Sequence, residues 1–122
     1  MADFPPQFRT TNATLQLYPF GGPVIPADSC GKHRVYVFAS DHVGNAALWT
    51  IDILTLRVNS NAPTVIGTPV KQATAGASTW SITPLTNPGG QLQMQVQGAV
   101  GVTIDWWFTN VESFQMVGAF VP

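Results

Sequence analysis

Alternation of apolar and polar residues runs through much of the chain and predicts β-strands. In residues 91–97, leucine, methionine and valine alternate with glutamines, so every second side chain lies on the same face of a strand. Residues 46–58 form the longest candidate strand, with Trp49, Ile51 and Ile53 on one side. Both segments are therefore expected to turn one face toward a hydrophobic core.

The second face of residues 46–58 changes character along its length. Thr50 and Asp52 are polar, whereas Leu54 and Leu56 are apolar. A strand that is apolar on both sides is typical of a sheet covered on both faces. We therefore expect this end of the strand to be covered on both faces.

Turn-forming residues divide the rest of the chain into similar segments. Residues 34–39 are rich in β-branched and aromatic side chains, as strands prefer, and residues 41–45 predict a hairpin loop, with Gly44 and Asn45 able to take positive φ. Ten prolines and eleven glycines interrupt the chain too often for long helices. Further strands are expected at 64–70, 79–83, 102–109 and about 111–117, with turns at 59–63, 73–77, 87–90 and 98–101.

About eight short strands at this spacing predict an all-β fold: a single-domain β-sandwich or jelly roll of short antiparallel strands spanning residues 1–122. The β core is expected at about residues 10–117, with residues 1–9 and 118–122 as extended arms. The alternation predicts a core lined by Trp49, Ile51, Trp80, Leu92, Met94, Val96 and Ile104.

Charged residues are scarce in this chain. They make up 9% of its 122 residues, against roughly 25% in ordinary soluble domains, while hydrophobic residues make up 45%. A protein that stays free in solution normally keeps a charged surface. We therefore expect burial against other protein molecules, in a homo-oligomer and foremost a homotrimer. The net charge of −1 gives no field that would attract nucleic acid or an acidic membrane.

Both ends of the chain carry large apolar residues, whereas termini are usually polar and loosely held. Phe4 and Phe8 lie near the start, and Phe120 and Val121 near the end. Two interpretations stand: the ends pack onto the core of their own domain, or they are arms that reach a neighbouring subunit. The scarcity of charge favours arms, so these four residues are predicted interface residues.

Trp106 and Trp107 are adjacent on a predicted strand and therefore point to opposite faces. One is expected to enter the core, and the other to face solvent, a partner subunit or a ligand; the alternative is that both are covered by the two faces of the domain itself. Trp107 is accordingly a further predicted interface residue, because tryptophan is common in protein interfaces and on carbohydrate-binding surfaces.

Residues that could carry chemistry are few. Cys30 is the single cysteine, and a role as a packed thiol is favoured over a nucleophile paired with His33. His33 and His42 match no metal-ligand pattern, and no phosphate-binding or nucleophile motif occurs. The sequence thus predicts no enzyme activity, no catalytic residue, no metal and no other cofactor.

No segment has the roughly 18 consecutive apolar residues of a membrane span. The N-terminus lacks the basic and apolar regions of a signal peptide. We therefore expect synthesis in a cytoplasm and no membrane partner.

Short strand and turn motifs follow one another at residues 10–14, 46–51, 65–69, 77–82, 90–98 and 103–107. Their order and spacing resemble a small β-domain of bacteriophage virion proteins, found at tail-fibre tips and in related particle proteins. Asp105 departs from the pattern, since members commonly carry a basic residue before the tryptophan of the last motif.

The resemblance implies a virion protein made in the cytoplasm of a bacterial host. Fibre proteins usually place this domain behind a long shaft, and the sequence shows none. We therefore expect a capsid decoration, or cement, protein that binds the phage major capsid protein or another virion protein and stabilises the assembled lattice. The alternative is a tail-fibre or head-fibre tip module that binds a host surface glycan or receptor.

Overall fold

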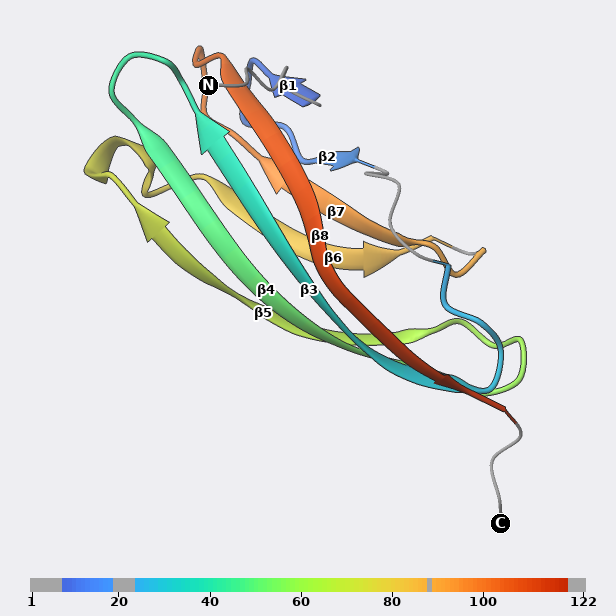
Figure 1. The fold of residues 1–122 in the computed structure, drawn as a ribbon. Coiled ribbons are helices and arrows are strands. Elements are labelled where there is room, and N and C mark those ends of the chain that lie inside the picture. Colours follow the sequence, from blue (N-terminus) through green and yellow to red (C-terminus); the bar gives the residue numbers. More distant parts are fainter. Residues whose placement is uncertain (1–7, 19–23, 88, 119–122) are drawn as a thin grey trace.

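The computed structural model describes residues 8–18, 24–87 and 89–118, which form eight β-strands and one short 3-10 helix. Figure 1 shows these elements along the chain. In order they are β1 (Phe8–Thr10), β2 (Gln16–Tyr18), β3 (Ser29–Ser40), β4 (Ala46–Arg57), β5 (Thr64–Ala73), η1 (Ala75–Ala77), β6 (Ser81–Thr86), β7 (Leu92–Gln97) and β8 (Ile104–Val117).

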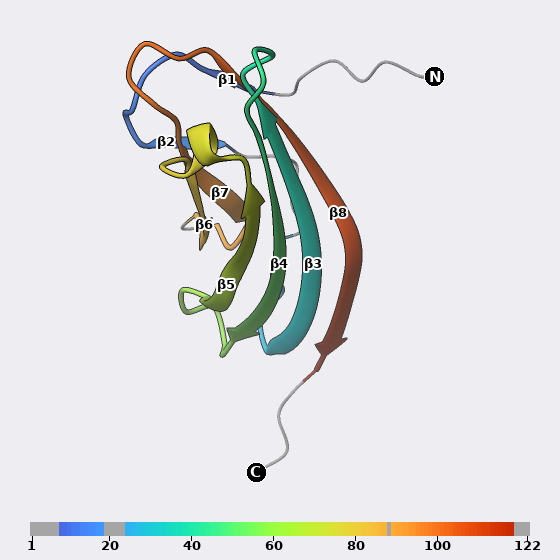
Figure 2. The same cartoon turned by 90° about the vertical axis from the view of Figure 1, so that its left-hand side faces the viewer.

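The strands pair into two antiparallel sheets, which confirms the predicted all-β sandwich. The larger sheet has the strand order β1-β8-β3-β4-β5, and the smaller has the order β2-β7-β6. In Figure 2 the long strands of the larger sheet curve around the smaller sheet, which lies on one side only. The strands of the larger sheet are longer than the short strands expected, reaching 12 residues in β3 and β4 and 14 in β8.

The prediction of two separate strands at 102–109 and 111–117 is wrong, because β8 is continuous. Its pairing with β3 contains a bulge: Val35 pairs with Asn110, whereas Arg34 pairs with Glu112. The extra residue at 111 shifts the alternation by one position. The side chains that follow at even numbers are therefore turned away from the smaller sheet.

The hydrophobic core lies between the two sheets. All seven residues predicted to line it are buried, which confirms the strand faces read from the alternation. Trp106 is also buried there and stacks on Trp49, with ring centroids 5.5 Å apart. The indole N–H of Trp106 donates a hydrogen bond to Thr10 Oγ1 at 3.0 Å.

Lys71 ties the connection after β5 to the core. Its ammonium donates hydrogen bonds to the backbone carbonyls of Ala77 (2.8 Å), Ser78 (2.9 Å) and Trp80 (2.5 Å). The same group lies 5.5 Å from the ring centroid of Trp49, within the range of a cation–π contact. One side chain thus fixes the 3-10 turn against the end of the sheet.

The hairpin loop between β3 and β4 lies where the sequence predicted it. Positive φ occurs at Gly44 (110°) and at His42 (62°) instead of Asn45. Asp41 Oδ1 accepts hydrogen bonds from the backbone N–H groups of Val43 and Asn45, at 2.9 and 3.0 Å. The hydrogen bond from the Asn45 side-chain amide lowers the pKa of Asp41 most, and the backbone bonds lower it further. Together these bonds hold the loop that presents His42.

Candidate interaction surface

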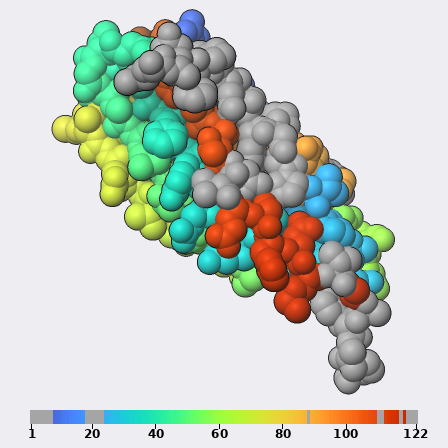
Figure 3. All heavy atoms as spheres, in the orientation of Figure 1, coloured from blue at the N-terminus to red at the C-terminus, as the bar shows by residue number. Residues whose placement is uncertain are grey.

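The side of the larger sheet that faces away from the smaller sheet is uncovered in the described part of the chain. We call it the outer face; it consists of the outward positions of β3, β4, β5 and β8. Figure 3 looks onto this face, where side chains of β3 (blue-green) and β8 (red) reach the surface. Its exposed large apolar residues are Phe38, Leu54, Leu56, Ile66, Val70, Phe114 and Met116.

The expectation that Leu54 and Leu56 are covered on this side is therefore wrong within the described residues. Leu54 is 53% exposed and Leu56 is 40% exposed. No described element packs over them, since the three-stranded sheet lies on the opposite side of β4 (Figure 2). Apolar outward positions on β4 thus mark a surface without a cover in the single chain.

The strand register gathers apolar side chains into rows across the outer face. In one row Phe114 of β8 is followed by Lys32 of β3, Leu54 of β4 and Ile66 of β5. Phe114 is 64% exposed and Ile66 is 60% exposed. An open hollow of about 460 Å³ lies beside Leu54 and Ile66, and Lys32, Asp52 and Thr68 also line it. The row offers an apolar surface with a shallow recess.

Four charged residues gather near the middle of this face. We call Lys32, Arg34, Asp52 and Glu112 the charged belt: the last three share one row, and Lys32 lies two residues from Arg34 on β3, in the neighbouring row. Arg34 makes two hydrogen bonds to the Asp52 carboxylate, from Nε to Oδ1 at 2.8 Å and from Nη2 to Oδ2 at 3.2 Å. These bonds hold the pKa of Asp52 below its ordinary value. Glu112 pairs with Arg34 from the other side, on β8, so the belt contains two cations on β3 flanked by one anion on each neighbouring strand.

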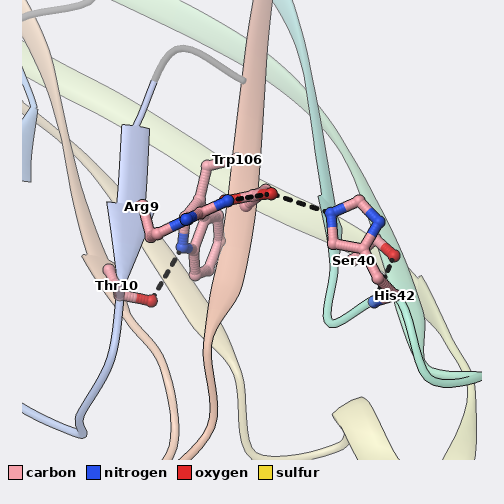
Figure 4. Close-up of polar contacts among 6 residues, drawn as sticks. Arg9, Thr10, Ser40, His42 and Trp106 are labelled. Carbon is pink, nitrogen blue, oxygen red and sulfur yellow. Dashed lines mark hydrogen bonds and ion pairs between the residues drawn. The ribbon is translucent and has the colours of Figure 1, made fainter. Parts of the chain in front are cut away.

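A buried carboxylate lies at the upper end of the sheet. Asp105 is 2% exposed, and its Oδ1 accepts a hydrogen bond from Arg9 Nε at 2.6 Å. Its Oδ2 lies 3.0 Å from Arg9 Nη2 and 2.8 Å from His42 Nε2. Arg9 of β1 and His42 of the hairpin loop, both labelled in Figure 4, thus hold the carboxylate from two different elements. The hydrogen bonds from Arg9, with a smaller contribution from His42, hold the pKa of Asp105 below its ordinary value.

Trp107 lies beside this cluster, on the side of β8 opposite to buried Trp106. It is half-buried, and its ring meets the imidazole of His42 edge to face, with centroids 6.1 Å apart. Phe38 pairs with it on β3. The prediction that the two tryptophans serve opposite faces is therefore confirmed, while the role of Trp107 in an interface stays a prediction.

The predicted interface residues of the two ends are only partly described. Phe8 belongs to β1, pairs with Trp106 and packs half-buried against the core. Residues 8 and 9 are thus part of the sheet, although the sequence predicted an arm over residues 1–9. Phe4, Phe120 and Val121 lie outside the described residues, and their role in an interface stays a prediction.

Cys30 and His33 are not brought together as a catalytic pair. Cys30 is half-buried on the outer face, whereas His33 is turned inward and buried. The His33 Nδ1 atom lies 2.9 Å from Ser113 Oγ, and burial lowers the pKa of the imidazole. The described ranges contain no cluster of three or more His, Cys, Asp or Glu side chains that could hold a metal.

Among the residues placed in the structure, no helix has the length and apolar character needed to cross a membrane.

The comparisons with known proteins give one structural likeness. No protein-family model and no curated protein matches the chain. Among solved structures, the fold is similar to part of the crystal structure of the Acinetobacter phage vB_ApiP_P1 tailspike protein, with a TM-score of 0.42 and 19% identity. The similar region covers 93% of this chain and 21% of the tailspike chain.

Proposed function

We propose that this chain is a structural protein of a bacteriophage virion, a capsid decoration protein that binds and stabilises the assembled major-capsid lattice. The observation that carries the proposal is the outer face, where large apolar side chains remain exposed in a chain with few charges, as suits a protein that works in contact with other protein molecules, its own copies included. Exposed apolar surface of this extent is typical of a protein interaction site. The resemblance of its strand and turn motifs to phage virion β-domains supports the choice of particle.

The mechanism of such a protein is physical and needs no reaction. A protein that binds the assembled lattice, and not its free subunits, stabilises the lattice by mass action. Many copies on one particle gain further through their high effective concentration. Large side chains near the chain ends, such as Phe4 and Phe120, would supply anchors of the kind that dominate interface energies.

The surroundings of Trp107 support a second candidate, a fibre-tip module that binds a host glycan. The indole is half-buried beside His42. The His42 and Arg9 side chains are 57% and 59% exposed, respectively. An aromatic face next to hydrogen-bonding groups is a combination that suits a sugar, because it offers large contact area together with polar partners.

Purified phage particles provide the test. Mass spectrometry should find this chain in many copies per particle. Particles made without it should regain it from solution and then resist heat and osmotic shock better than particles left bare. Variants that lack residues 1–7 or residues 119–122 should keep the melting temperature of the free protein while their occupancy on particles falls.

Two results would contradict the decoration proposal. One is that purified protein does not bind bare particles and that its loss leaves their heat resistance unchanged. The other is that particles lacking the protein stay intact but no longer attach to host cells, and that Trp107→Ala has the same effect. The second result would establish the glycan-binding candidate in its place.

A further inference from the structure

One edge of the larger sheet is poorly suited to binding another strand. There, β5 contains Pro69, which has no N–H to donate and is a common guard of exposed edges. At the other edge, β1 pairs with only three residues of β8, residues 104–106. Association through the outer face is therefore favoured over association through the β5 edge.

The outer face offers a broad area for a contact between copies. Four strands about 4.8 Å apart, with nine residues of about 3.3 Å rise each, give a flat area of roughly 600 Å², whereas a standard interface buries about 800 Å² of accessible surface on each partner. The long strands curve around the smaller sheet, so the outer face is convex (Figure 2). Two copies therefore meet over its middle rows, which contain the charged belt and the apolar row, and not over the whole face.

The charged belt restricts what can cover this face. Its two cations, Lys32 and Arg34, both lie on β3, and its anions lie on the neighbouring strands, Asp52 on β4 and Glu112 on β8. The charges balance, so neither a strongly acidic nor a strongly basic partner is favoured. A facing surface with the same charge pattern, displaced by one strand, would place its Arg34 over the Asp52 of this surface. Its Asp52 would in turn lie over the Arg34 of this surface.

We infer that the outer face binds the outer face of a second copy of this chain, through a twofold axis that runs along the strands between β3 and β4. In this arrangement β3 of each copy lies over β4 of the other. Arg34 then lies over Asp52 of the second copy, and Phe114 lies over its Ile66. The aliphatic stem of Lys32 covers Leu54, as long cationic side chains do on apolar surfaces.

The same charges disfavour the other simple arrangements. A twofold axis perpendicular to the strands would stack β3 on β3 and bring Arg34 near Lys32 of the other copy. A threefold ring needs two different patches that fit each other, whereas the outer face is a single patch that complements itself. The homotrimer predicted from composition would therefore have to use other surfaces.

This inference deepens the proposed function and rests on it for the idea that the protein works in many copies. In the proposed dimer the outer face serves self-association, and the chain ends remain available to the lattice. The mass of the free protein in solution tests dimer formation, whereas the occupancy of the protein on particles tests the virion role. Either proposal can therefore fail without the other.

Sedimentation equilibrium across a concentration series tests the pair on the full chain. The wild-type mass should rise from one copy to two. Leu54→Asp should give one copy at every concentration, because it places an unpaired charge in the contact. The matched control is Val100→Asp, which changes an equally apolar but 82% exposed side chain in the loop before β8 and should still form pairs. Circular dichroism should show that both variants are folded.

Charge reversal tests the geometry of the pair. Arg34→Glu and Asp52→Lys should each weaken pairing by about tenfold or more, because like charges then face each other across the axis. An equimolar mixture of the two variants should form pairs again. In the mixed pair the introduced glutamate of one variant meets the introduced lysine of the other, and the remaining Asp52 meets the remaining Arg34. A wild-type mass of one copy throughout, a mass of three copies, or a mixture that fails to pair would overturn the inference.

Discussion

The carboxylate of Asp105 is nearly excluded from solvent, yet both of its oxygens form hydrogen bonds with side chains from distant segments. Arg9 lies 96 positions away in sequence and His42 lies 63 positions away. One residue therefore joins β1, β8 and the hairpin loop. A buried charge of this kind is stabilising only while its partners remain in place.

Replacing Asp105 with asparagine should lower the free energy of unfolding by about 1–3 kcal/mol, because a buried acceptor for Arg9 and His42 is lost. The lowered pKa of the carboxyl also makes its contribution pH-dependent: it is present above 3.8, the ordinary value, and is lost as pH falls below it. Urea unfolding at neutral pH and at pH values below 3.8 checks both statements. An unchanged midpoint in the asparagine variant would contradict the first.

His33 should make the protein less stable in mildly acidic solution. Burial lowers its pKa below 6.5, so the unfolded chain binds the proton more readily. The free energy of unfolding should be at its full value above about pH 6.5 and fall as the pH drops toward the folded-state pKa. Melting curves across this range should show the slope in wild type but not in His33→Gln. An unchanged slope in His33→Gln would assign it to another group.

At the level of single residues, the sequence predicted the core well. Alternation is a local property of a strand. From it, the burial of residues such as Val96 and Met94 and the opposite orientations of Trp106 and Trp107 were predicted correctly. The partners of Asp105 could not be predicted in the same way. They depend on which strands become neighbours, and that is a property of the topology.

Among the elements, β8 shows how a bulge hides a strand from pattern analysis. The residues around Asn110 and Glu112 break the alternation, and the sequence was therefore divided into two strands. The structure instead absorbs the extra residue in a bulge opposite Arg34 and Val35. The bulge places Phe114 and Met116 on the outer face, so the same feature that concealed the strand also completes the candidate surface.

The short helix η1 and the chain around it depend on Lys71 more than on their own sequence. Replacing Lys71 with methionine should lower the free energy of unfolding by about 1–3 kcal/mol, because three backbone carbonyls lose their hydrogen-bond donor. The neighbouring exposed residue provides the control, and Gln72→Met should change the stability little. Thermal unfolding of both variants checks the difference. Equal effects would show that the carbonyl contacts contribute nothing measurable.

At the scale of the whole molecule, the larger sheet of the sandwich has one face covered by the smaller sheet and one face that no described residue covers. The composition predicted contact with other protein molecules, because charges are too few for an ordinary free surface. It could not show where that contact would be. Outward positions such as Leu54 and Ile66 resemble core residues in the sequence, and only the one-sided placement of the smaller sheet reveals that they are exposed.

The charged belt was also invisible in the sequence. Lys32 and Arg34 are roughly twenty residues from Asp52 and about eighty from Glu112. The sheet register alone places Arg34 between Asp52 and Glu112 in one row, with Lys32 in the next. Separate charges of both signs looked like scattered surface groups. In the sheet they form a pattern that can match a second copy of itself.

The most direct test of the account is hydroxyl-radical footprinting of this protein on intact phage particles and in dilute solution. Met116 and Phe114 are each 64% exposed in the single chain, and loop residue Val100 is 82% exposed. The account predicts that Met116 and Phe114 react readily in dilute solution and become strongly protected on particles, while Val100 reacts in both states. Equal reactivity of Met116 and Phe114 in the two states would contradict the claim that the outer face is covered by protein in the virion.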